Sequence, residues 1–232
     1  MDKLAADING VALLDDPVRR AIYLFVVDQP DDVGRDQVAR AVRVSRALAA
    51  FHLDRLVDAR LLDAGFRRRA PRSGRGAGRP PKVYRRSARQ IDVTLPRREY
   101  AFLAELMAAS IDDPRSSDPA QSLRRRASDL GTSLGADARR RAGVRPTRRR
   151  LVAAAEGVLR AQGFAPYRAA DGALCLRNCP FDALVPKHRD LVCAMNVELN
   201  DGLLKGLRLG GVRPSFEPTD GRCCVVLREK PV

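Results

Sequence analysis

The sequence lacks a hydrophobic run long enough to cross a membrane. Its longest apolar stretch, Ala21 to Val27, is seven residues long, whereas a transmembrane helix needs about 20. The chain does not open with the charged segment, apolar segment and small-residue cleavage site of a secretory signal peptide. We therefore expect a cytoplasmic protein with no membrane partner.

The sequence has few histidines, and histidine is the side chain most often used in acid–base catalysis. The chain has two histidines, and neither stands in a Ser/His/Asp or Glu/His spacing typical of a catalytic site. Gly74, Gly76 and Gly78 lie in an arginine-rich stretch, not between a strand and a helix, where a phosphate-binding loop would need them. The sequence therefore predicts that the protein is not an enzyme.

Acidic residues are missing from 64–91, a stretch that holds ten basic ones. The whole chain has 43 Lys and Arg against 28 Asp and Glu, a net charge of +15. Such a surplus indicates a polyanionic partner, most commonly a nucleic acid. A non-specific RNA or chromatin binder is one protein class that fits this charge.

The first 95 residues predict a winged helix-turn-helix. Asp16 is placed to cap a helix that starts at Pro17, a short helix fits 35–42, and Ser45 is placed to cap a third helix to about Arg60. Residues 61–66 and 83–84 are expected to pair as strands around the Gly- and Arg-rich stretch 72–81. A basic hairpin after a recognition helix is a wing that suits the DNA backbone. A disordered linker is the alternative for this stretch.

The third helix has a predicted core stripe of Ala49, Leu53 and Leu56, which leaves the opposite face for the DNA major groove. On that face Phe51 could contact a thymine methyl group or pack under the wing. The expected DNA-binding residues of helix and wing are Ser45, Arg46, Ala47, Ala50, Phe51, Arg55, Arg72, Arg75, Arg79 and Lys82.

Several short motifs of this region resemble a known group. They are VSR at 44–46, FHLDRLV at 51–57, LL at 61–62, GRP at 78–80 and YRR at 84–86. Together they look like the winged-helix part of ArsR/DeoR-like bacterial regulators. That group usually has a glycine at the end of the recognition helix, where this chain has Ala59 and Arg60.

Residues 96–145 predict a helical linker with a heptad-like seam of Leu123, Ala127, Leu130 and Leu134. This seam either packs on its own domain or pairs with a second copy. Because a single winged helix reads only a short half-site, we expect a homodimer on an inverted-repeat DNA operator. The predicted class is thus α+β, with a winged helix-turn-helix DNA-binding domain (1–95), a helical linker and dimerisation region (96–145) and a small α+β sensor domain (146–232).

Cysteine is absent before residue 175, and all five cysteines lie in the last 58 residues. In a reducing compartment such clustering indicates metal or redox chemistry. Cys193 falls opposite the apolar stripe of a helix expected over 189–207, a face that a merely packed cysteine should not prefer. Cys223 and Cys224 are expected in a strand over 222–228, where their side chains would point to opposite faces, so that only one joins a common site.

The cysteine pattern also carries a resemblance. Asn178-Cys179-Pro180, then Cys193, then Gly221-Arg222-Cys223 is similar to the three-cysteine pattern of SufR-type repressors. The resemblance implies a winged-helix dimer that binds an iron–sulfur cluster in its C-terminal domain and represses transcription.

Carried over to this chain, the resemblance implies Cys179, Cys193 and Cys223 as cluster ligands. The fourth ligand is expected to be Cys175, with Cys224, His188 or a non-protein group as alternatives. A structural zinc ion, a small-ligand pocket and direct thiol oxidation are the other interpretations of this domain.

Overall fold

The computed structural model describes residues 3–66 and 80–229. The chain divides into two compact units, 1–93 and 94–232. Both helices and antiparallel strands are present, which confirms the α+β class. In the described ranges no helix is at once long and apolar enough to span a membrane.

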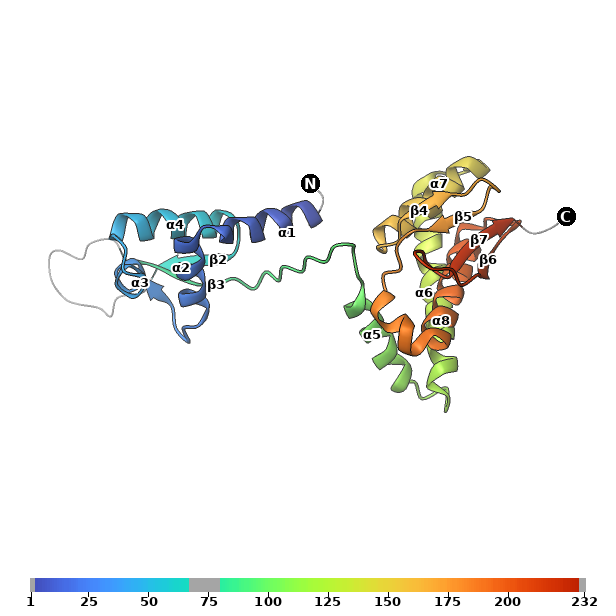
Figure 1. The fold of residues 1–232 in the computed structure, drawn as a ribbon, viewed down its shortest axis with the longest axis horizontal. Coiled ribbons are helices and arrows are strands. Elements are labelled where there is room, and N and C mark those ends of the chain that lie inside the picture. Colours follow the sequence, from blue (N-terminus) through green and yellow to red (C-terminus); the bar gives the residue numbers. More distant parts are fainter. Residues whose placement is uncertain (1–2, 67–79, 230–232) are drawn as a thin grey trace. The chain divides into compact units, whose positions relative to one another are not determined.

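Unit 1 combines helices with a small antiparallel sheet (Figure 1). The strand order of this sheet is β1-β3-β2. The predicted helices and the strand pair are confirmed, whereas the first helix and the first strand escaped the sequence analysis. The elements are α1 (Lys3–Ala12), the 3-10 turn η1 (Leu13–Asp15), α2 (Pro17–Val27), β1 (Val33–Gly34), α3 (Arg35–Val42), α4 (Arg46–Asp58), β2 (Leu62–Phe66) and β3 (Lys82–Arg86).

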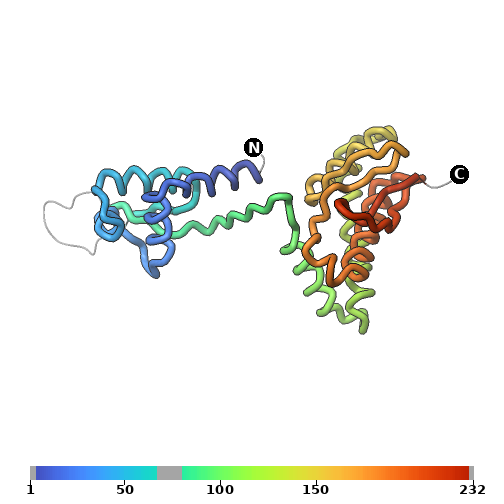
Figure 2. Tube along the Cα trace, in the orientation of Figure 1, coloured from blue at the N-terminus to red at the C-terminus, as the bar shows by residue number. Residues whose placement is uncertain are grey.

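Local signals start two of these helices. The Asp16 carboxylate accepts a hydrogen bond from the backbone N–H of Arg19 at 2.9 Å, and Pro17 follows it. The Ser45 hydroxyl accepts one from the backbone N–H of Leu48 at 3.1 Å. Both residues satisfy N–H groups that a helix start leaves without a partner. The connection from α3 to α4 is only three residues long and turns through Arg43 in the left-handed conformation (Figure 2).

The core of unit 1 lies between the helices and the sheet. The predicted stripe is confirmed, because Ala49, Leu53 and Leu56 are 0% exposed. They pack with Ile22 of α2 and Tyr84 of β3. Apolar burial of this extent is the main term that stabilises a small unit.

Unit 2 joins four helices to an antiparallel sheet with the order β4-β5-β7-β6. Its elements are α5 (Tyr100–Ile111), α6 (Pro119–Ala142), α7 (Arg148–Ala161), β4 (Pro166–Arg168), β5 (Leu174–Leu176), η2 (Asp182–Leu184), α8 (Val185–Leu207), β6 (Val212–Phe216) and β7 (Val225–Glu229). The segment expected as a separate helical linker, 96–145, belongs to this same compact unit.

Helices α6 and α8 lie side by side and form the centre of unit 2 (Figure 1). A Cβ atom on Gly131 would lie 2.1 Å from the carbonyl oxygen of Leu199, and one on Gly206 would lie 2.1 Å from that of Thr132. Only glycine permits so close an approach of two backbones. Leu123 and Ala127 of the predicted seam are buried in the core of this unit, so this part of the seam packs on its own domain.

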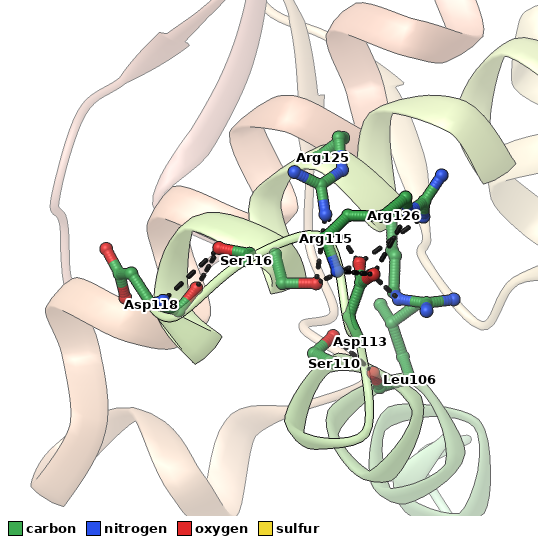
Figure 3. Close-up of polar contacts among 9 residues, drawn as sticks. Leu106, Ser110, Asp113, Arg115, Ser116, Asp118, Arg125 and Arg126 are labelled. Atoms are coloured by element: carbon green, nitrogen blue, oxygen red, sulfur yellow. Dashed lines mark hydrogen bonds and ion pairs between the residues drawn. The ribbon is translucent and has the colours of Figure 1, made fainter.

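A buried carboxylate organises the loop between α5 and α6. Asp113 is 3% exposed, and Figure 3 shows arginines converging on it. Its carboxylate accepts hydrogen bonds from the Nε of Arg115 at 3.0 Å and the hydroxyl of Ser122 at 2.7 Å, and pairs with Arg125 and Arg126. The hydrogen bond from Arg115, followed by that from Ser122, holds the pKa of Asp113 far below its usual range. A charge buried in this way is tolerated because it is paired and hydrogen-bonded.

Candidate functional site

The first candidate site is the exposed face of α4. Arg46, Ala47, Phe51 and Arg55 are exposed and Ala50 is half-buried. Phe51 is 52% exposed, and the guanidinium of Arg55 lies 5.6 Å from the centre of its ring. Phe51 is therefore available to a ligand of this face, with a cation already placed beside it.

Leu48 belongs to the same face, although the sequence analysis left it out. Its side chain is 40% exposed. Leu48 lies one helical turn before Phe51, and this spacing could have predicted that the two side chains share a face. Ser45 contributes as the cap of α4, so its hydroxyl is engaged by the helix itself.

The predicted basic contacts differ in how they are held. Arg46 pairs with Asp36 of α3 at 2.6 Å, with both side chains well exposed. Lys82, at the start of β3, pairs with Asp54 of α4 at 2.6 Å. The predicted contacts Arg72, Arg75 and Arg79 lie outside the described residues.

A polar network fastens α4 to the sheet beside it. Asp54 accepts hydrogen bonds from Lys82 at 2.6 Å, from the Tyr84 hydroxyl at 3.1 Å and from Arg35 at 3.1 Å. Burial alone would raise the pKa of Asp54, but the hydrogen bonds from Lys82 and Tyr84 outweigh it and hold that pKa below the ordinary value. The hydrogen bond to Asp54 in turn raises the pKa of Lys82. The Lys82 ammonium group is therefore bound to Asp54, and this contact orients α4.

The second candidate site is a set of thiols in unit 2. Cys179 lies in the loop after β5, Cys193 on α8, and Cys223 and Cys224 directly before β7. The prediction that Cys223 and Cys224 diverge within a strand is wrong, because the strand begins only at Val225. Without the strict alternation of a strand, both side chains can meet thiols from other elements.

These four thiols form two linked pairs. The interaction between the Cys179 and Cys223 side chains lowers the pKa of Cys179 and raises that of Cys223. Burial raises the pKa of Cys193 to about 12, and the charge of Cys224 and a hydrogen bond with it act in the same direction. The charge of Cys179 also raises the pKa of Cys193. These interactions link Cys179 with Cys223 and Cys193 with Cys224, and Cys224 is one of the alternatives expected for the fourth ligand.

Cys175, the expected fourth ligand, is not part of this group. It packs against Ala173 and Val226. Its neighbours on β5, Leu174 and Leu176, belong to the main core together with Cys193 and Cys223. Because successive side chains of a strand alternate, Cys175 points to the opposite face of the sheet. His188 is exposed at an irregular position in α8, where φ is −134°.

The wheel argument for Cys193 is also wrong. The helix bears buried residues on several faces, and Cys193 itself is 4% exposed within the main core. The reason is that α8 contacts α6, α7 and two strands of the sheet. Because buried residues occur on more than one face of α8, a position opposite the apolar stripe does not distinguish a ligand from a packed thiol.

Two polar residues around the thiols, Arg98 and Asn196, escaped the sequence analysis. Arg98 donates to the carbonyl oxygen of Cys179 at 2.9 Å and to the side chain of Asn178. The amide of Asn196 donates to the Cys223 sulfur at 3.3 Å and is itself buried. Asn196 lies three residues after Cys193 on α8, which is a spacing that could have suggested its role.

The chemistry open to this group follows from its donors. Four sulfur atoms are the donor set of zinc and of iron–sulfur centres. Over residues 3–66 and 80–229, however, no three His, Cys, Asp or Glu side chains are grouped as a bound metal ion requires. The donors thus fit a thiolate centre, while their present arrangement is that of two thiol pairs.

Comparison with known proteins found no matching family model, no matching curated protein and no matching solved structure.

Proposed function

We propose that the chain is a DNA-binding transcription regulator, a repressor, in which unit 1 is a winged helix-turn-helix. The observation that carries the proposal is the exposed face of α4, with Arg46, Phe51 and Arg55, presented beside a hairpin whose intervening segment is rich in arginine. The strand order β1-β3-β2 after a three-residue helix connection supports it. Such a head places one helix in the major groove and the hairpin on the flanking backbone.

A homodimer on an inverted-repeat operator is part of this proposal. One head reads a short half-site, and two heads raise specificity by reading two half-sites about 34–36 Å apart. The net charge of +15 adds attraction for any duplex and makes the affinity dependent on salt. The protein is proposed to have no enzymatic activity of its own.

The test is selection of bound duplexes from a random pool by the full chain, followed by affinity measurements at several salt concentrations. We expect an inverted-repeat sequence bound about 1,000-fold more tightly than random DNA. Phe51→Ala and Arg55→Ala should reduce this preference, whereas Arg213→Ala removes an exposed charge from β6 and should preserve it. Equal affinity for all duplexes would contradict the proposal and favour a non-specific binder.

For unit 2 we propose that Cys179, Cys193, Cys223 and Cys224 hold an iron–sulfur cluster that controls DNA binding. The support is that these four thiols gather from a loop, a helix and a strand start, although as pairs rather than around one centre. Cluster binding would displace the protons of Cys193 and Cys223 and turn both pairs toward one centre. The Arg98 and Asn196 contacts would then orient Cys179 and Cys223.

Anaerobic reconstitution with iron and sulfide tests this proposal. We expect thiolate-to-iron absorption and stoichiometric labile sulfide in the full chain. Cys224→Ser should reduce cluster content as strongly as Cys179→Ser does, and Cys175→Ser should leave it unchanged. Stoichiometric zinc without sulfide would favour a structural zinc site instead.

Direct thiol oxidation is a second candidate, favoured by the pairing itself. A peroxide could take two electrons and two protons from Cys179 and Cys223 to form one disulfide and water. Peroxide treatment of the metal-free chain, followed by mass mapping of disulfides, would distinguish this route from cluster loss.

A further inference from the structure

Unit 2 contains a cavity that the proposed function does not use. It has a volume of about 510 Å³ and lies between α7, β5 and β7 and the end of α8. Pockets for small organic ligands typically span roughly 300–1,000 Å³. None of the cysteines lines it.

The floor of this cavity is apolar. It consists of Leu174, Leu204, Leu209 and Leu227, each at most 7% exposed, together with the half-buried Val152 and Val212. No hydrogen-bonding side chain belongs to this floor, so it favours an apolar chain or ring over a sugar or a nucleotide base.

The rim, by contrast, is charged. Arg148 is held by Glu229 at 2.8 Å and by the carbonyl oxygen of Gly210 at 2.9 Å. Arg168 is held by Glu156 at 3.5 Å. Arg149 also lines the cavity, and within the described part of the chain it has no ion pair. Glu156 is shared with Arg160, which lies 3.2 Å from it, so the rim is positive, and Arg149 is its cation without an ion pair among the described residues.

We propose that this cavity binds a small amphipathic carboxylate, with its apolar chain or ring on the leucine floor and its carboxylate at Arg149. A single arginine without an ion pair in the described ranges suits one carboxylate rather than a polyphosphate. An ion pair beside an apolar wall is strengthened because water is partly excluded there. This proposal does not depend on DNA binding or on the thiols.

Isothermal titration of the full chain with decanoate tests the site, and decanol serves as the uncharged probe of equal length. We expect saturable binding of one decanoate per chain and much weaker binding of decanol. Arg149→Ala should weaken decanoate binding about tenfold. Val152→Trp, which fills the cavity, should abolish it. Arg150→Ala is the matched control, because Arg150 is an exposed neighbour on α7 that does not line the cavity. The Arg150→Ala variant should bind decanoate with the affinity of the wild type.

Any of four results would overturn the proposal. The first three are no saturable binding of decanoate, unchanged binding in Val152→Trp, and equal weakening by Arg149→Ala and Arg150→Ala, which would mean general attraction to a basic surface. Decanol binding as tightly as decanoate would exclude the carboxylate as the recognised group. Circular dichroism shows whether Val152→Trp folds, and Arg149→Ala, an exposed change, tests the site even if Val152→Trp does not fold.

Discussion

Arg60, two residues after the end of α4, has a backbone φ of +58°, in the left-handed region. This region disfavours residues that carry a Cβ atom, and glycine adopts it without strain. The ArsR/DeoR-like group that these motifs resemble usually has a glycine at this helix end. The chain makes this left-handed turn with a residue that carries a Cβ atom.

Arg60→Gly should stabilise unit 1 by about 1 kcal/mol, because the relieved strain exceeds the added flexibility of the unfolded chain. In thermal unfolding this corresponds to a rise of about 4–8 °C for a unit of this size. Ala59→Gly is the control: Ala59 has φ −78°, so glycine relieves nothing there and should destabilise. Destabilisation by Arg60→Gly would mean that the turn is not left-handed.

The lowered pKa of Asp54 leads to a second prediction for a single residue. Asp54→Asn should destabilise unit 1 by about 1 kcal/mol at pH 7, because the charged contacts with Lys82 and Arg35 are lost. A carboxyl with a lowered pKa stabilises the fold above its unfolded pKa of about 4, and this contribution disappears as the pH falls through the folded value. The difference between variant and wild type should therefore shrink below about pH 4.

Urea unfolding at a series of pH values measures this difference. Asp58→Asn removes an exposed carboxylate from the same helix and should have little effect at any pH. A destabilisation by Asp54→Asn that stays constant down to pH 2 would show that the network acts by packing rather than by charge.

At the scale of elements, the pair α6 and α8 determines how unit 2 is built. The backbones approach at Gly131 and Gly135 of α6 and at Gly202 and Gly206 of α8. The contacts advance in the same direction along both helices, so the two helices run parallel. A parallel pair needs the long connection through α7, β4 and β5 that the chain provides.

Gly131→Ala should destabilise unit 2 by about 3 kcal/mol or more, because the new Cβ atom meets the backbone of α8 and one of the helices must shift. Gly157→Ala is the control. It lies on α7, where a Cβ atom meets nothing within 4 Å, and alanine should stabilise that helix by up to about 1 kcal/mol. Chemical denaturation monitored by circular dichroism measures both, and equal effects would contradict the close packing.

At the scale of the whole molecule, the two compact units have separate hydrophobic cores. Differential scanning calorimetry of the full chain should therefore show two unfolding transitions. Arg60→Gly should move only one of them and Gly131→Ala only the other, because distant sites in separate cores do not couple. A single transition that both variants shift would mean that the units unfold together.

Much of the fold could be predicted from local chemistry. Asp16 and Ser45 each cap the helix that the sequence assigned to them. The stripe of Ala49, Leu53 and Leu56 is buried as its period required. The sequence analysis missed β1, which is two residues long, and α1, which is held through the ion pair of Asp7 with Arg89 at 2.8 Å.

The sequence by itself therefore determined the element types, the basic surplus of the first unit and the confinement of cysteine to the second. These properties follow from composition and from spacings of a few residues. Only the tertiary structure decided that α6 packs against α8 within its own unit, that Cys224 rather than Cys175 joins the other thiols, and that Lys82 is bound to Asp54. Each of these depends on contacts between residues far apart in the chain, which local periodicity does not encode.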